Sequence, residues 1–257
     1  MKILRYETID GPRFGALENG GGIRVLEGSP FGEFSLGKEV ASIDDVRLLP
    51  PIEPTKVIGV GLNYVSHIEE MGLTQPSFPM LFMKPLTAII GPGDPIVYPK
   101  KGRQVEYEAE LAVVIGKEAR NVKEQNALEY VLGYTCGNDV SERIIQKAEM
   151  ALGALLICKG FDTFNPLGPV VDTDVSPSDL QVTARVNGVE RQNASTSDLL
   201  FNVSQLVSYI SEAILLLPGD VIMSGTPSGV GPIVPGDHVE IEIEGIGVLD
   251  NPVISES

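Results

Sequence analysis

The stretch Glu106-Tyr107-Glu108-Ala109-Glu110, which runs directly into Leu111-Ala112-Val113-Val114-Ile115, indicates both a core strand and a place for chemistry. Side chains alternate across a β-strand, so Glu108 and Glu110 point to one face, and Glu106 can join them at the strand's start. Carboxylates that share a partly buried face repel one another and must take up protons or hold a cation. A divalent metal ion meets that need. A solvated strand edge with protective charges is the alternative, and the apolar run that follows argues against it.

The composition describes an acidic chain of globular character. Its 257 residues can bury a substantial core in one large domain, or in one main domain with a small appendage. The net charge of −16 repels nucleic-acid backbones and anionic membranes, so we expect small molecules or proteins as partners. No apolar run approaches the roughly 20 residues of a membrane-spanning helix. The N-terminus lacks the apolar stretch of a signal peptide, and we expect a cytoplasmic protein.

The histidine and cysteine content restricts the kind of metal site. Only His67 and His238 are present, so a catalytic zinc site with three histidines is impossible. A metal must depend mainly on oxygen ligands, which favours Mg²⁺, Mn²⁺ or Ca²⁺. Cys136 and Cys158 lack CxxC spacing, and we expect buried thiols rather than a disulfide.

Two parts are predicted along the chain. Residues 1–50 contain short β-like runs broken by glycine and predict a small β module, and the prolines within residues 48–54 mark a semi-rigid linker to the part that follows, residues 51–257. In that second part the patterns predict strands at residues 57–60, 111–115, 183–186 and 239–243, and helices at residues 65–71, 140–151 and 203–214.

Asp139 stands between a strand-like segment, residues 134–138, and the predicted helix at 140–151. Aspartate is a favoured helix N-cap, and Glu142 three residues later would complete a capping box. Asp139, Arg143 and Gln146 would also share one helix face, so that an acid, a guanidinium and an amide converge on one space. From these residues alone the cap is the preferred interpretation.

His67 follows a glycine-led turn, and Glu70 at i+3 can reach its ring. A carboxylate on one imidazole nitrogen fixes the tautomer and raises the basicity of the other nitrogen, as a general base requires. An exposed helix with an incidental histidine and glutamate explains the same segment, and on this segment alone that interpretation is favoured.

Two further segments present candidate polar groups. Lys159 leaves the apolar run 155–158, which we expect to be a buried strand, and its ammonium could meet an anionic ligand or simply reach solvent. The glycine-rich turn at 225–232 follows the strand-like run 220–223 but lacks the Lys-Ser/Thr of a Walker loop. Its amides could form an anion nest with the Thr226 hydroxyl, or it could be a plain hairpin turn.

Taken together, these segments resemble the fumarylacetoacetate hydrolase family over about residues 56 to 250. Residues 1–50 are similar to the small N-terminal module of a prokaryotic branch of that family. The long members carry a further N-terminal metal-ligating aspartate that we do not place in this sequence, so the chain resembles the short, acylpyruvase-like branch. Seven motifs occur in the family's order: GLNYVSHIEEMG, FMKP, EYEAELAVVIG, GYTCGNDVSERIIQ, KGFDTFNPLGP, VNGVERQ and PGDVIMSGTPSGVGP.

The resemblance implies an α+β fold, a mixed and mostly antiparallel β-roll with flanking helices, in which residues 51–257 are the catalytic domain. It also implies a homodimer with Mg²⁺ or Mn²⁺ at the mouth of the roll. Glu106 falls on a variable family position and is left out. Carried over by motif, the metal ligands are Glu108, Glu110 and Asp139, the catalytic groups are His67 and Glu70 on a lid together with Lys159, and the substrate-binding residues are Arg143, Gln146 and Thr226.

On this resemblance we predict an enzyme that acts on a small 2-oxo acid and hydrolyses the C–C bond of an acylpyruvate. His67, oriented by Glu70, would activate water, and the metal with Lys159 would stabilise the pyruvate enolate. Oxaloacetate decarboxylation and isomerisation of 2-hydroxyhepta-2,4-diene-1,7-dioate use the same site and remain open. A non-catalytic metal- or ligand-binding module would explain the carboxylates but leaves His67 with Glu70 without a role.

Overall fold

The computed structural model describes residues 1–257 and is dominated by three β-sheets. In the main sheet the strands follow the order β4-β3-β2-β1-β13-β11-β10-β16-β5-β6, and β7 pairs with β13. The strands of this sheet are β1 (Lys2–Tyr6), β2 (Arg13–Leu17), β3 (Gly22–Gly28), β4 (Phe34–Ser42), β5 (Val57–Gly61), β6 (Met80–Lys84), β7 (Ile89–Ile90), β10 (Ala109–Ile115), β11 (Val131–Asn138), β13 (Asn165–Asp172) and β16 (Val221–Met223).

Two smaller sheets complete the strand structure. The five-stranded sheet contains β15 (Val189–Ser195), β14 (Gln181–Val186), β18 (His238–Ile243), β19 (Gly247–Ser255) and β8 (Ile96–Tyr98). The three-stranded sheet contains β12 (Ser141–Glu142), β9 (Val105–Tyr107) and β17 (Gly231–Pro232). Strand pairs are antiparallel except β13 with β7, β16 with β5 and β19 with β8. The predicted α+β fold with mixed, mostly antiparallel sheets is therefore confirmed.

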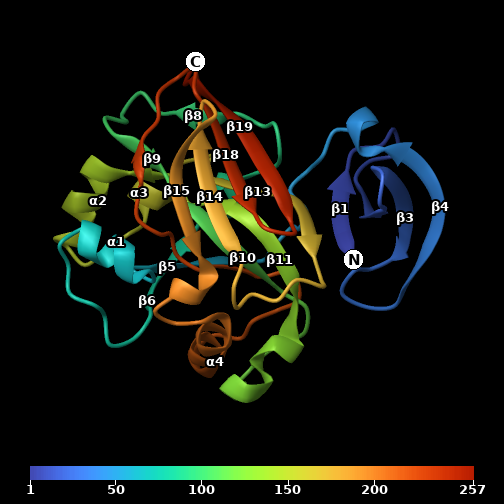
Figure 1. Cartoon of the computed structure of the whole chain (residues 1–257), viewed down its shortest axis with the longest axis horizontal. Helices are drawn as coiled ribbons and strands as arrows, with labels where there is room; N and C mark the ends of the chain where they lie inside the picture. The colour runs from blue at the N-terminus through green and yellow to red at the C-terminus, as the bar shows by residue number, and fades with distance from the viewer.

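The helices are short and lie outside the sheets. In Figure 1, α1, α2 and α3 gather on one side of the molecule and α4 lies below the strands. No helix combines the length and the apolar character that crossing a membrane requires. The α-helices are α1 (Val65–Glu70), α2 (Arg143–Met150), α3 (Ile157–Gly160) and α4 (Val203–Ala213), and the 3-10 segments are η1 (Ile43–Asp45), η2 (Leu86–Ala88), η3 (Glu124–Tyr130) and η4 (Thr196–Asp198).

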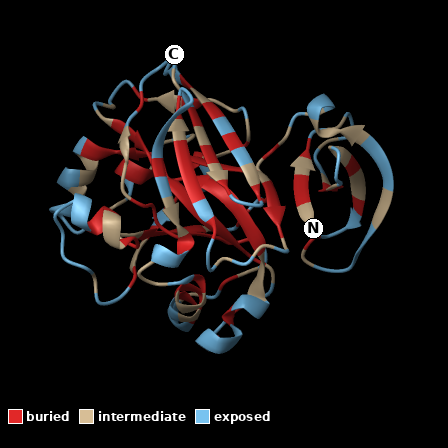
Figure 2. Cartoon of the chain, in the orientation of Figure 1, coloured by how far each residue is buried: buried red, intermediate tan, exposed pale blue.

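Strand β10 is buried along its whole length. Leu111, Val113 and Ile115 belong to the larger hydrophobic core, to which β14, β18 and α4 also contribute, whereas Ala112 and Val114 belong to a smaller core on the opposite face of the strand. Figure 2 shows these buried strands at the centre of the molecule. The predicted core strand is thus confirmed, and its uninterrupted apolar run reflects burial on both faces.

The N-terminal strands β1 to β4 form an antiparallel series beside the main body (Figure 1). Strand β1 pairs with β13 through Lys2 with Asp172 and Ile3 with Val171, so hydrogen bonding continues from this part into the rest of the main sheet. The outermost strand, β4, has no buried residue (Figure 2). A domain boundary near residue 50 stays a prediction.

Two local predictions are wrong. The helix expected at 140–151 begins at Arg143, because residues 141–142 pair with β9, and its N-cap is Glu142, whose side chain accepts the Ile145 N–H. The buried strand expected at 155–158 is absent. Leu156 and Ile157 are exposed, and Lys159 lies instead in the single-turn helix α3. The thiol prediction is confirmed, since Cys136 and Cys158 are both free and buried.

Strand pairing brings four chain segments to one edge of the main sheet. The start of β10 lies beside the end of β11, where Ala109 pairs with Asn138. Strands β16 and β5 are parallel to each other, and β16 is antiparallel to β10. Strands β16 and β5 therefore end at the sheet edge where β10 begins. Residues that follow β11, β16 and β5 therefore meet the residues that open β10.

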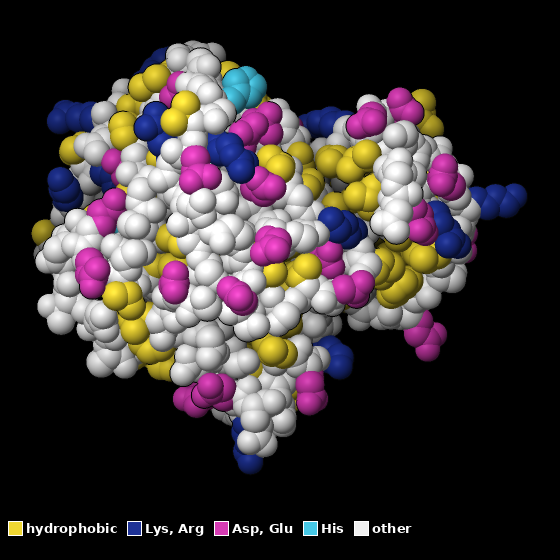
Figure 3. All heavy atoms as spheres, in the orientation of Figure 1, with side chains coloured by type: hydrophobic (Ala, Val, Ile, Leu, Met, Phe, Trp, Pro, Cys, Tyr) yellow, Lys and Arg dark blue, Asp and Glu magenta, His cyan; other side chains and the backbone are white.

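The outer surface has the acidic character that the net charge of −16 predicts. Figure 3 shows Asp and Glu side chains scattered over the visible face, over the N-terminal strands as well as the main body.

Candidate active site

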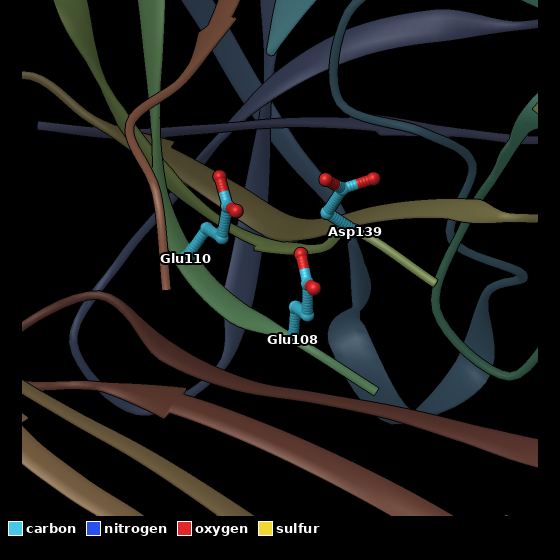
Figure 4. A group of neighbouring side chains, drawn as sticks. All are labelled: Glu108, Glu110 and Asp139. Atoms are coloured by element: carbon cyan, nitrogen blue, oxygen red, sulfur yellow. The ribbon is translucent and has the colours of Figure 1, made fainter. Parts of the chain in front are cut away.

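Glu108, Glu110 and Asp139 form a buried carboxylate triad at this sheet edge, with ligand atoms that all lie within 4.8 Å of one another. Glu108 lies between β9 and β10, Glu110 is the second residue of β10, and Asp139 follows β11. Figure 4 shows the three carboxyl groups close together, carried by two separate chain segments. The Asp139 N–H donates to the Glu108 carbonyl at 2.9 Å, which holds the two segments in register.

Lysine and arginine side chains pair with two of the three triad carboxylates but not with the third. Lys159 Nζ lies 2.7 Å from both Glu108 Oε2 and Asp139 Oδ2, and Arg143 Nη2 lies 2.6 Å from Glu108 Oε1. Lys84, which is fully buried, donates to Asp139 Oδ1. Glu110 forms no ion pair and accepts only the Gly225 N–H, at 2.8 Å.

Because the cations pair with Glu108 and not with Glu110, the pKa values of these two carboxyls are shifted in opposite directions. Burial opposes ionisation of Glu108, but Lys159 and Arg143 outweigh it and hold the pKa of Glu108 well below its ordinary value. Burial, with the charges of Asp139 and Glu108, raises the pKa of Glu110 well above its ordinary value. The triad therefore contains one carboxyl whose charge the protein leaves uncompensated.

These residues fit a divalent cation. Three carboxylates that converge from two segments supply hard oxygen donors, and a cation among them would offset both the burial and the neighbouring charges that raise the pKa of Glu110. An all-oxygen donor set suits Mg²⁺ or Mn²⁺ better than zinc. The triad can thus hold a divalent metal ion.

Glu106 does not join the triad, although it could have done so by strand alternation. Its Oε2 accepts from Arg143 Nε at 2.6 Å, and its Oε1 accepts from Gln104 Nε2 at 2.6 Å. Arg143 in turn donates from Nη1 to Gln146 Oε1 at 2.8 Å. The guanidinium therefore bridges Glu106 and Glu108, and Glu106 orients Arg143.

His67 lies on α1 and is buried, which excludes the exposed-helix interpretation. Its Nδ1 lies 3.1 Å from Glu70 Oε2, and Glu70 Oε1 accepts the Gly229 N–H at 3.0 Å. Glu70 thus links the imidazole to the glycine-rich segment 225–232. With Nδ1 engaged, Nε2 is the ring nitrogen left to accept a proton.

Thr226 lies at the pocket wall, and its Oγ1 accepts from Gln192 Nε2 at 2.8 Å. Gln192 also accepts the Ala109 N–H at 2.9 Å, so it ties the start of β10 to residue 226. The preceding Gly225 has φ +101°, and an added Cβ would lie 2.6 Å from Asn63 Cβ, so only glycine fits there. The Gly225 amide is directed to Glu110, not into a free anion nest.

One pocket unites the predicted polar residues. Glu70 is the exception, because it contacts His67 from outside the lining. No role was predicted from the sequence for Lys84 or Gln192. Both residues lie in motifs that carry the family resemblance, FMKP and VNGVERQ, and that membership is the signal that could have identified them. The predicted residues that line the pocket are His67, Glu108, Glu110, Asp139, Arg143, Gln146, Lys159 and Thr226.

Two known protein families match this chain. Residues 56–254 match the family described as fumarylacetoacetate (FAA) hydrolase C-terminal, and residues 1–51 match the description Rv2993c-like, N-terminal. The chain therefore belongs to the fumarylacetoacetate hydrolase family. Protein Rv2993c of Mycobacterium tuberculosis is 44% identical over 99% of this chain and 98% of its own length. An oxaloacetate tautomerase, mitochondrial fahd2 of Xenopus laevis, is 38% identical over 99% of this chain and 90% of its own.

Solved structures share the fold across the whole chain. A 5-carboxymethyl-2-hydroxymuconate delta-isomerase from Mycobacterium smegmatis is 44% identical with a TM-score of 0.93, and the match covers 100% of both chains. A maleylpyruvate hydrolase from Sphingobium sp. SYK-6, in complex with manganese(II) and pyruvate, is 28% identical with a TM-score of 0.82, again over 100% of both chains. Relatives of this chain thus include isomerases, hydrolases and a tautomerase.

Proposed function

We propose that this chain is a Mg²⁺- or Mn²⁺-dependent enzyme of 2-oxo acids that hydrolyses the C–C bond of an acylpyruvate. The observation that carries the proposal is the joint occurrence, in one pocket, of the buried carboxylate triad and His67 paired with Glu70. A binding module needs only the triad. The maleylpyruvate hydrolase with bound manganese and pyruvate supports the proposed head group.

The carboxylate triad, His67 with Glu70, and Lys159 each have a distinct role in the proposed reaction. A bound Mg²⁺ or Mn²⁺ would supply Lewis acidity for the adjacent carboxylate and 2-oxo oxygens. His67 accepts a proton from water at Nε2 while Glu70 holds Nδ1. The water oxygen adds to the distal carbonyl, the C–C bond breaks, and its electron pair remains on the pyruvate enolate. Lys159 stabilises that negative charge, and protonation at carbon yields pyruvate.

A second candidate is proton transfer or decarboxylation without hydrolysis. The names of the isomerase and tautomerase relatives favour it. Isomerisation needs a proton shuttle, and oxaloacetate decarboxylation needs only a stabilised enolate, so neither reaction requires activated water. The demand on His67 therefore separates these reactions from hydrolysis.

Steady-state kinetics on a panel of acylpyruvates, oxaloacetate and 2-hydroxydienedioates with added Mg²⁺ tests the proposal. In His67→Ala, acylpyruvate cleavage should fall by roughly 10²–10⁴-fold, and oxaloacetate decarboxylation should fall far less. Lys159→Ala should depress both reactions together, because both pass through an enolate. His238→Ala is the matched control, since His238 is exposed and pairs with Asp250 away from the pocket.

Three outcomes would change the assignment. An equal loss of both reactions in His67→Ala would replace water activation by a role in closing the site or protonating the enolate. A wild type that cleaves no acylpyruvate would give precedence to the second candidate. Metal binding without turnover of any 2-oxo acid would leave a binding module.

A further inference from the structure

The catalytic pocket opens into an apolar groove that no proposed step uses. This groove lies between β6, residues 80–83, and the segment at the end of α2, Met150 with residues 153–156. Four residues line both the pocket and the groove, so the two are continuous: Met80, Phe82, Met150 and Leu155.

Charge is distributed unevenly along this continuous space. The cations Arg143 and Lys159 lie at the triad end, where both pair with carboxylates. Beyond the triad, the pocket wall includes Met71 and Leu73, and the groove is lined by eight hydrophobic residues and Gly153, with no lysine or arginine. A ligand whose head lies at the triad would therefore extend its far end along apolar side chains.

We propose that the groove binds the tail of the substrate and selects 2-oxo acids whose far end is apolar and uncharged. The inference depends on the proposed function only in placing the 2-oxo head at the triad. A second carboxylate at the far end would lose part of its hydration against the apolar lining, which contains no lysine or arginine to pair with it. Each added methylene would instead remove apolar surface from water.

Calorimetric titration of the Mn²⁺-loaded protein tests this without requiring turnover. The probes are pyruvate and the straight-chain 2-oxo acids up to 2-oxooctanoate, compared with 2-oxoglutarate and 2-oxoadipate as ligands of matched length with a distal carboxylate. Affinity should rise about 4-fold per methylene once the tail reaches the groove. A distal carboxylate should bind at least about 10-fold more weakly than the methyl-ended acid of the same length.

A variant that introduces a positive charge sharpens the test. Met150→Lys introduces an ammonium where the pocket and groove meet. The ratio of the affinity for the methyl-ended acid to that for the carboxylate-ended acid of the same length should therefore fall by about 10-fold or more. Leu152→Lys is the matched control, because Leu152 is 86% exposed on the same segment and lines neither space. That variant should leave the preference unchanged.

The outcomes separate this inference from the proposed function. Graded affinity without acylpyruvate cleavage would sustain the tail site and overturn hydrolysis. Binding of pyruvate with affinity independent of tail length, or equal tolerance of the distal carboxylate, would overturn the tail site alone. If affinity does not change with tail length, and a wild-type dimer becomes monomeric in Met150→Lys, the groove would be assigned to a second copy of the chain. Failure of every 2-oxo acid to bind would overturn both.

Discussion

At the scale of single residues, the site combines carboxylates that differ in how the protein compensates their charge. Glu108 contacts two cations, and Asp139 contacts both buried lysines. Glu110 has a single backbone amide. The difference between Glu108 and Glu110, two residues apart in the chain, therefore arises from their neighbours rather than from their own chemistry. Glu110 is the position at which a bound cation changes the electrostatic energy most.

The metal assignment leads to a paired substitution. Glu110→Gln should lower Mn²⁺ affinity by about 100-fold or more, since the loss of a ligand exceeds the 10–100-fold typical for residues that merely orient ligands. The fold should persist, because the change relieves carboxylate repulsion and keeps an acceptor for the Gly225 N–H. Glu106→Gln is the control and should bind Mn²⁺ far better than Glu110→Gln, since Glu106 contacts Arg143. Calorimetric Mn²⁺ titration decides between them, and wild-type affinity in Glu110→Gln would remove that residue from the ligand set.

Lys84 leads to a stability prediction. Lys84→Met would leave the Asp139 carboxylate with one lysine fewer in a buried site, and we expect the metal-free protein to lose about 3–5 kcal/mol of unfolding free energy. Mn²⁺ should raise the unfolding free energy of Lys84→Met by more than it raises that of the wild type, because the bound ion would neutralise Asp139 in place of the missing lysine. Urea unfolding with and without Mn²⁺ measures both effects.

A partly buried lysine outside the site, Lys56, supplies the control for that experiment. Lys56 pairs with the fully buried Asp220, which lies outside the triad and the pocket. Lys56→Met should be destabilising as well, but Mn²⁺ should give it no extra recovery. Equal recovery in the two variants would contradict a link between Lys84 and the metal site.

At the scale of elements, α1 and the residues after it differ in how firmly they are held. The helix is anchored by the buried side chains of Tyr64 and Ile68 and by the contact of Glu70 with Gly229. Leu73 and Phe78 in the following segment are 42% and 60% exposed. The short helix alone suggests few apolar anchors, but the tertiary contacts hold its start. We therefore expect the mobile part of a lid to be residues 71–78.

Hydrogen exchange across residues 62–78 tests the lid. Oxalate added with Mn²⁺ should increase protection, most strongly at residues 71–78, because a closed segment exchanges more slowly. Helix α4 is the internal control, since its apolar face packs against the core and its N-terminus is capped by Asn202 with Gln205. Unchanged protection at 71–78, under conditions where calorimetry shows that oxalate binds, would contradict a moving lid.

At the scale of the whole molecule, we propose that the chain works as a homodimer, as the family resemblance implies. Leu86 and Ile157 are 47% and 53% exposed and belong to segments that touch where Gly160 packs against Pro85. Leu86→Glu with Ile157→Glu should shift light scattering from dimer to monomer, because charges oppose burial of this surface. Ile9→Glu, at a fully exposed position in the N-terminal part, should not. A monomeric wild type would contradict the proposal.

Local patterns in the sequence were enough for several elements and part of the site. The apolar run 111–115 predicts β10, and helical spacing from residue 203 predicts α4, because both patterns reflect burial on a fixed period. Strand alternation and the i+3 spacing likewise place Glu108 with Glu110 and His67 with Glu70. The scarcity of histidine already directs the metal chemistry toward oxygen donors.

The tertiary structure alone decided what joins these pieces. Asp139 reaches Glu110 because β10 and β11 pair in one register, not because Asp139 caps a helix. Lys84 meets Asp139 across 55 positions of sequence, and Gln192 ties Ala109 to Thr226 across 83 and 34 positions. Periodicity and capping act over a few residues and can be recognised in the chain. Ion pairs between distant segments depend on strand order, and the energy of burying charge is set only once those segments are packed together.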